Sequence, residues 1–170
     1  MKKYYIAAIF FFISITSFVF LQNQEKCFSF VETQVSWNSM SGILQDGENI
    51  EVWEWYYNCH EVARWDIVIY QTVSRGQLVK EIKVLPWDRL QADFENGYLK
   101  VNAEVLSNYA WEKYIFTRWE LTFMQLYFPD GQMKEKNYFI FWTTVSGWYD
   151  SRKIAWITKE SLVWKVFLKK

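Results

Sequence analysis

An uncharged, apolar run opens the chain and predicts a membrane anchor. It extends from Tyr4 to Leu21 behind Lys2 and Lys3. As a helix it would measure roughly 27 Å, which is close to the ~30 Å hydrocarbon core of a bilayer. The residues that follow Leu21 lack the small pair that signal-peptide cleavage requires. A buried core helix is the weaker alternative, because the run is long and rich in Phe.

The chain is therefore predicted to have three parts. Residues 1–3 form a short cytoplasmic N-terminus, which the two lysines hold inside the cell. Residues 4–22 form a single-pass transmembrane signal anchor in the cell membrane. Residues 23–170 form one extracytoplasmic, β-rich domain, since no repeat or linker divides them.

From Val31 onward the pattern is that of β-strands. Strands of alternating or β-branched residues are predicted over Asn49 to Tyr57, Asp66 to Tyr70 and Gln77 to Leu85. Two turn dipeptides between apolar runs predict hairpins: Asn96-Gly97, between 90–94 and 98–101, and Asp130-Gly131, between 126–128 and 138–141. No long segment of helical period follows the anchor. We therefore expect a mainly antiparallel β domain with a short helix near residues 159–163.

Composition narrows the possible chemistry. The formal net charge is +0 with scattered Lys and Arg, so no basic face for nucleic acid is expected. His60 is the only histidine, and we interpret it as an exposed loop residue, not as part of a Ser-His-Asp triad. No metal-spaced cluster and no phosphate loop is present, so neither a metal nor a cofactor is expected. Cys27 and Cys59 could form a disulfide in an oxidising compartment or could remain free.

The remaining catalytic possibility is a nucleophile that a lysine activates. A neutral lysine can take a proton from a serine when burial lowers its pKa. Alternation along residues 78–85 places Lys80 among aliphatic side chains on one face of a strand, and Lys83 with Glu81 on the other. Lys83 can then pair with Glu81 or reach solvent, so Lys80 is the candidate base. The alternative is that Lys80 extends its side chain to water.

Four blocks, in order, resemble those of type I signal peptidases. The segment from Val35 to Glu48 resembles the nucleophile box, with Ser39 and Met40 on its Ser-Met pair. The other blocks are Arg64 to Val68, Lys80 to Asp88, and Trp142 to Arg152. The register of the third block puts the family's general base on Lys80. The last block ends in Asp150-Ser151-Arg152, and the resemblance implies that Asp150 and Arg152 form a bracing ion pair. A plain surface pair is the alternative.

The resemblance implies both fold and function. The fold would be mainly β, an antiparallel signal-peptidase-like catalytic domain behind one N-terminal transmembrane helix. The function would be that of a membrane-bound serine endopeptidase with Ser39 as nucleophile, Lys80 as base, and Met40, Asp150 and Arg152 in support. Its partners would be secretory preproteins with small residues at P1 and P3, together with membrane lipid, with no nucleic acid, cofactor or metal.

Three alternatives stay open. The first is a catalytically inactive or divergent membrane-tethered β domain of the same family. The second is a Ser-Lys self-cleaving repressor-type protease, which would carry DNA-binding helices in place of the anchor. The third is a β module unrelated to proteases, for which four ordered blocks would be a coincidence.

Tryptophan is abundant and glycine scarce. The chain has 11 Trp and 6 Gly, although average usage would give about 12 Gly. Several tryptophans stand on or beside glycine positions of the family pattern: Trp37, Trp65, Trp87, Trp142, Trp156 and Trp164. An indole cannot do what glycine does where φ is positive or the backbone is crowded. Since UGA is read as Trp in one variant genetic code and as Gly in another, we hypothesise that many of these residues are glycine in the cell. Sequence alone assigns neither identity to the remaining five, Trp53, Trp55, Trp111, Trp119 and Trp148.

Overall fold

The computed structural model describes residues 29–35, 40, 42–72, 76–145 and 149–168. Its strands are β1 (Ser29–Gln34), β2 (Asn49–Glu54), β3 (Ile67–Thr72), β4 (Gly76–Val84), β5 (Leu90–Asp93), β6 (Tyr98–Val101), β7 (Glu104–Val105), β8 (Asn137–Phe141), β9 (Ile157–Thr158) and β10 (Leu162–Phe167). Its helices are α2 (Tyr56–Cys59), α3 (Arg118–Gln125), α4 (Ser151–Ile154) and the 3-10 helix η2 (Lys159–Ser161). The predicted anchor, residues 4–22, lies outside these ranges. Within them, no helix combines the length and the apolar character that crossing a membrane requires.

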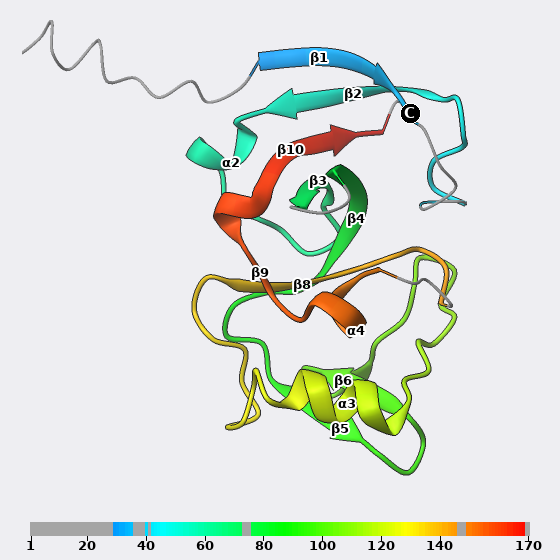
Figure 1. Ribbon diagram of the computed structural model, residues 1–170, viewed down its shortest axis with the longest axis vertical. Coiled ribbons are helices and arrows are strands. Elements are labelled where there is room, and N and C mark those ends of the chain that lie inside the picture. Colours follow the sequence, from blue (N-terminus) through cyan, green and yellow to red (C-terminus); the bar gives the residue numbers. More distant parts are fainter. Residues whose placement is uncertain (1–28, 36–39, 41, 73–75, 146–148, 169–170) are drawn as a thin grey trace, which may run out of the picture.

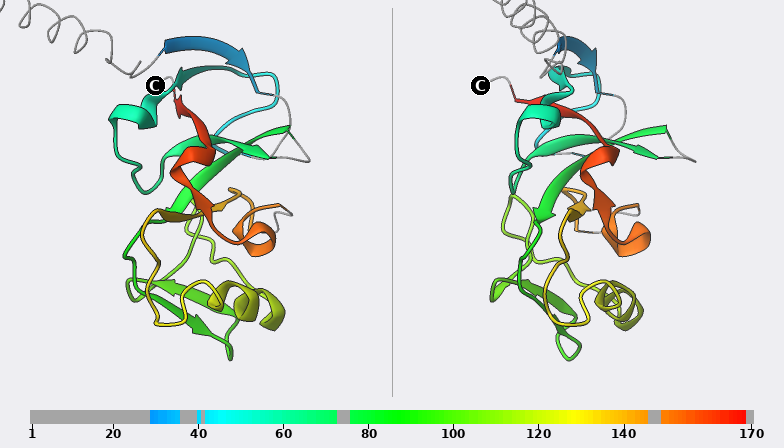
Figure 2. Two further views of the ribbon diagram at one scale, coloured as in Figure 1. Left: turned by 60° about the vertical axis from the view of Figure 1, so that its left-hand side comes forward. Right: turned by 90° about the vertical axis from the view of Figure 1, so that its left-hand side faces the viewer.

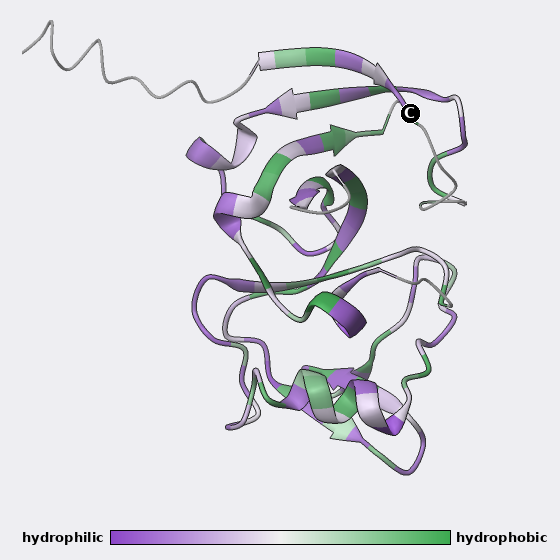
Figure 3. Cartoon of the chain, in the orientation of Figure 1, coloured by the Kyte–Doolittle hydropathy of each residue, from purple (hydrophilic) through white to green (hydrophobic). Residues whose placement is uncertain are grey.

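A seven-stranded antiparallel sheet organises most of the domain (Figure 1). Its strand order is β1-β2-β10-β3-β4-β8-β9. In β2, hydrophilic and hydrophobic residues alternate (Figure 3), and Ile50 and Val52 are the buried ones. In β3, Ile67, Val68 and Ile69 are all buried, because apolar clusters cover both faces of the sheet there. The prediction of a mainly antiparallel β fold is confirmed.

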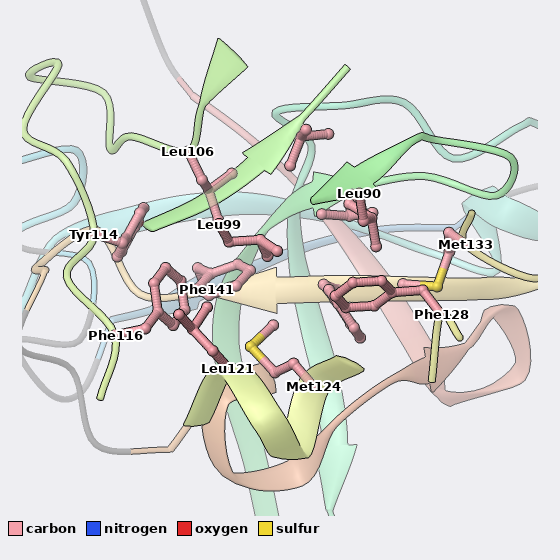
Figure 4. Close-up of a cluster of buried hydrophobic side chains, with 13 residues drawn as sticks. Leu90, Leu99, Leu106, Tyr114, Phe116, Leu121, Met124, Phe128, Met133 and Phe141 are labelled. Atoms are coloured by element: carbon pink, nitrogen blue, oxygen red, sulfur yellow. The ribbon is translucent and has the colours of Figure 1, made fainter. Parts of the chain in front are cut away.

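A smaller unit lies at the other end of the molecule, where the three-stranded sheet β5-β6-β7 faces α3 (Figure 1). The predicted hairpin is present here: β5 pairs antiparallel with β6, and Gly97 has φ +70°. Leu121, Met124 and Phe128 pack with Phe141 of β8 in the core of this unit (Figure 4). β8 of the seven-stranded sheet and α4 lie next to this smaller unit (Figure 1, Figure 2).

The second predicted hairpin is wrong. Residues 126–128 form no strand. They follow helix α3, and β8 pairs instead with β4 and β9. The helix begins at a capping box, in which the Thr117 hydroxyl accepts from the Glu120 N–H and the Glu120 carboxylate accepts from the Thr117 N–H. The turn itself is present, since the Gly131 N–H donates to the Phe128 carbonyl at 2.9 Å.

Three other expectations changed in detail. The strand predicted to reach Tyr57 ends at Glu54, and α2 follows. The short helix near residues 159–163 is the 3-10 turn η2, which leads directly into β10. His60 is half-buried rather than exposed, because its ring stacks on that of Tyr56 with 4.0 Å between centroids.

Candidate active site

Lys80 lies in the middle of β4 and is fully buried. Its backbone pairs with Val68 of β3. The ammonium Nζ donates to the Val79 carbonyl at 2.8 Å and lies 4.7 Å from the centroid of the Trp142 ring. The prediction that Lys80 is buried among apolar groups is therefore confirmed, and the alternative of a side chain extended to water is wrong.

Burial makes Lys80 a potential base. Loss of hydration lowers its pKa from the usual value to about 7, and the negative charge of Asp150 opposes part of this shift. No carboxylate of the described residues forms an ion pair with Lys80. A large fraction of the amine is therefore neutral near pH 7, which is the state that accepts a proton.

The Asp150 carboxylate is instead bound by Arg152. Arg152 Nε lies 2.9 Å from Oδ1 of Asp150, and its terminal NH2 lies 2.6 Å from Oδ2. Asp150 also caps α4 by accepting from the Arg152 N–H, and it accepts from the Trp142 N–H at 3.3 Å. Both side chains are buried. The implied ion pair is confirmed, and the alternative of a plain surface pair is wrong.

This ion pair holds the end of β8 beside Lys80. The Ile140 N–H donates to the Ser151 hydroxyl at 2.8 Å, so two consecutive residues of the Asp150–Arg152 block bind the β8 backbone. The Trp142 ring lies beside Lys80 Nζ, so the contact that holds the Trp142 backbone also positions the ring next to the amine. Asp150 therefore acts on Lys80 by binding this backbone and by its negative charge, and Arg152 holds the Asp150 carboxylate in place.

Two residues of this arrangement were not predicted. The Tyr114 hydroxyl donates to the Trp142 carbonyl, and the Asn108 amide donates to the Thr143 carbonyl at 2.9 Å. Both side chains are buried and come from the loop before α3. No local motif marks them, because their role depends on a contact with a segment about thirty residues away in the chain.

Met40, which follows the predicted nucleophile in the sequence, packs against the sheet. Its side chain is buried in a cluster with Leu44, Ile67 and Ile69, and Val79 packs against the same cluster. Val79 precedes Lys80 in β4, so residue 40 packs against the strand that carries the candidate base, although successive side chains of a strand point to opposite faces. Ser39 lies outside the described residues, as do Ser36, Trp37 and Ser41 of the same box and Ser146 and Trp148 of the last box.

Lys83 adopts one of the two arrangements that the sequence left open. It does pair with Glu81, at 2.8 Å, but it does not face solvent, since both side chains are buried. The ring of Trp65 covers Lys83 Nζ, with 3.6 Å to the centroid. Alternation within one strand could not reveal this cover, because Trp65 reaches β4 from another part of the chain.

Comparison with known families gives a match to the family described as "Signal peptidase, peptidase S26", over residues 3–169. The chain belongs to this signal peptidase family. No curated protein matches the chain. Among solved structures, one that is similar is the crystal structure of a signal peptidase I from Enterococcus faecalis V583. It has a TM-score of 0.43 and 19% sequence identity, and the match covers 61% of this chain and 94% of that chain.

Signal peptidases are hydrolases of the peptide bond, so membership of this family implies a serine peptidase. The Arg64 to Val68 block of this family member makes contacts between strands. Arg64 binds Asp88 at 2.7 Å and the Lys83 carbonyl at 2.5 Å, and Asp66 binds Lys165 at 2.6 Å. These contacts join the segment before β3 to the end of β4 and to β10.

Cys59 of this family member is disulfide-bonded. The chain has one other cysteine, Cys27, which lies outside the described residues. Of the two states left open by the sequence, the structure thus gives Cys59 the bonded one. A disulfide is typical of proteins in an oxidising compartment.

Proposed function

We propose that this signal peptidase family member is a membrane-anchored serine endopeptidase that removes signal peptides with a Ser39–Lys80 dyad. The observation that carries the proposal is the state of Lys80. It is buried in the sheet, it has a pKa of about 7, and the nearby carboxylate of Asp150 is engaged by Arg152. A lysine in this state can act as a base near neutral pH.

The proposed reaction begins when Ser39 Oγ attacks the carbonyl carbon of the scissile peptide bond. Neutral Lys80 Nζ takes the hydroxyl proton as the O–C bond forms, and the backbone N–H of Ser39 helps to stabilise the oxyanion. Lys80 then donates a proton to the leaving amine as the C–N bond breaks, leaving an acyl-enzyme. Water hydrolyses the ester, with Lys80 taking its proton and Ser39 regaining one.

The proposed substrates are secretory preproteins that are still held in the membrane by their signal helices. Small side chains at P1 and P3 would enter shallow pockets while the peptide adds as an extended strand near Ser39. The anchor at residues 4–22 would keep the catalytic domain on the extracytoplasmic face, against membrane lipid. The disulfide at Cys59 supports that location.

The dyad is tested with the full-length protein in detergent and a precursor that carries an Ala-x-Ala cleavage site. Ser39→Ala and Lys80→Ala should each abolish cleavage while the circular dichroism spectrum stays unchanged. Cleavage that is lost in Ser39→Ala but retained in Lys80→Ala would refute the dyad. Ser161→Ala, which alters a serine of η2 outside the site, serves as the matched control and should cleave normally.

A second candidate function is that of a catalytically inactive member of the family, and one observation favours it. The Trp142 indole lies against Lys80 Nζ, and its own Nε1 is buried without a hydrogen-bond partner among the described residues. This ring occupies space beside the amine. If it blocks the site, the unaltered chain should fail to cleave the precursor, and Trp142→Gly should restore cleavage that Lys80→Ala again removes.

A further inference from the structure

Four tryptophans have a backbone conformation that side chains rarely adopt. Trp55, Trp65, Trp87 and Trp111 have φ of 63°, 73°, 70° and 63°. Every glycine among the described residues also has positive φ: Gly42, Gly47, Gly76, Gly97 and Gly131 lie at 94°, 79°, 70°, 70° and 71°. Positive φ is natural for glycine, and for a bulky residue it is an outlier. The four tryptophans thus share the backbone of the glycines of this same chain.

We infer that residues 55, 65, 87 and 111 are glycine in the protein that the cell makes. Tryptophan would stand at these positions because a UGA codon, which one variant genetic code reads as glycine, has been read as tryptophan. The inference does not depend on the proposed peptidase function. It strengthens the case for residues 65 and 87, and it adds residues 55 and 111, to which the sequence pattern alone gives no identity.

The turn at residues 85–88 gives the clearest evidence. The Asp88 N–H donates to the Leu85 carbonyl at 3.2 Å, so Pro86 and Trp87 are the two central residues. Proline in the first central position and positive φ in the second are the pattern of a type II turn, which calls for glycine in the second. The Trp87 indole is 60% exposed, so packing offers no evident compensation.

The turn at residues 63–66 repeats this geometry. The Asp66 N–H donates to the Ala63 carbonyl at 3.2 Å, which again places the positive φ of Trp65 in the second central position. Its backbone N–H donates to the Ile82 carbonyl at 2.8 Å. The backbone at residue 65 is therefore held by two neighbouring contacts and cannot relax without disturbing β4.

Trp111 closes a three-residue hairpin loop. The Trp111 N–H donates to the Asn108 carbonyl at 3.1 Å, and the Asn108 N–H donates to the Glu112 carbonyl at 2.9 Å. A turn that ends in a left-handed residue is a standard form of this loop, and glycine is the usual residue there. The indole is 80% exposed. Trp55 caps α2 in the same left-handed conformation, with φ 63° and ψ 8°.

The other described tryptophans form a second class. Trp53, Trp119, Trp142, Trp156 and Trp164 have no positive φ. Trp53 of β2 packs its ring on that of Phe167 in β10, with 4.6 Å between centroids, as an ordinary strand tryptophan does. The backbone therefore separates four of the nine described tryptophans from the rest, and a general enrichment in tryptophan would not make such a division.

Peptide mass spectrometry of the protein purified from its native cells tests the inference. Trypsin releases residues 65–75, 84–89 and 101–113 as separate peptides, each with a single tryptophan position. Residue 55 is read by fragmentation of peptide 27–64 after reduction. Synthetic peptides with and without Trp65→Gly, Trp87→Gly and Trp111→Gly provide the reference masses. We expect the glycine mass at all four positions, and a tryptophan mass at any of them overturns the inference there.

The gene gives an independent second reading. Codons 55, 65, 87 and 111 should all be UGA, and a UGG codon at any of them contradicts the inference at that position. A third measurement compares two synthetic genes expressed in one host, the chain with tryptophan and the chain with all four residues changed to glycine. The glycine form should melt at the higher temperature, whereas a lower melting temperature would show that the indoles are needed.

Discussion

The surroundings of Lys80 and Lys83 differ although the two lysines lie three residues apart on β4. Both are buried, and desolvation lowers both pKa values. Lys83 has Glu81 at 2.8 Å, whose negative charge restores part of its pKa. Among the described residues Lys80 donates only to a backbone carbonyl, and the charge that raises its pKa is that of Asp150, already bound to Arg152. Equal burial thus gives a structural ion pair in one place and a candidate base in the other.

An indole covers each amine, but on different backbones. Trp142 lies over Lys80 at 4.7 Å from a backbone position without positive φ, whereas Trp65 lies over Lys83 at 3.6 Å from a turn with positive φ. If residue 65 is glycine, the cover over Lys83 is missing in the native protein, and Lys83 becomes more hydrated. The contrast between the lysines would then be larger in the cell than in the chain as written.

The largest expected effect separates the two lysines by activity. Lys80→Met should lower kcat/KM for precursor cleavage by about 10⁶-fold, as loss of the general base does in serine proteases. The double variant Lys83→Met with Glu81→Leu removes the other pair together and should keep most of the activity. Equal losses in the two variants would show that burial in β4, and not proton transfer, is what the assay detects.

The next effect separates them by stability. Glu81→Gln leaves Lys83 buried without its counter-ion, so the free energy of unfolding should fall by about 3 kcal/mol. Urea unfolding at pH 7 measures this change. Adding Lys83→Met to Glu81→Gln should recover most of the loss, since the uncompensated charge disappears. If the double variant is no more stable than the single one, the pair is not what stabilises this part of the strand.

The pH dependence of activity should report Lys80 alone. Because the neutral amine is the active form, kcat/KM should rise with pH up to the Lys80 pKa of about 7 and should fall about tenfold per unit below it. Asp150→Asn removes a negative charge that raises this pKa, so the limb should move to lower pH in the remaining activity. The Lys83→Met, Glu81→Leu variant should leave the limb in place. If the limb moves in this variant, the titration does not belong to Lys80 alone.

Local patterns in the sequence predicted β4, the hairpin of residues 90–101 and the burial of Lys80, since each depends on residues close together in the chain. Helix α3 was missed although its capping box, Thr117 to Glu120, is visible in the sequence. The Asp130-Gly131 turn led to the prediction of a hairpin between its neighbouring apolar residues, and this hairpin does not form. The covers over Lys83 and Lys80, and the contacts of Asn108 and Tyr114, arise from distant segments and leave no local signal.

The smallest effect concerns the cover over Lys83. Trp87→Gly relieves a left-handed tryptophan with an exposed ring, so the free energy of unfolding should rise by about 1 kcal/mol. Trp65→Gly relieves the same backbone cost but also removes the ring over the Lys83 amine, a contact worth about 1 kcal/mol. The two terms nearly cancel, so Trp65→Gly should change stability less than Trp87→Gly. It should also make Lys83 react faster with an amine reagent, whereas Lys80 keeps its rate. A gain as large as that of Trp87→Gly would mean that the Trp65 ring contributes nothing to the burial of Lys83, and the difference between the two lysines would then rest on Glu81 alone.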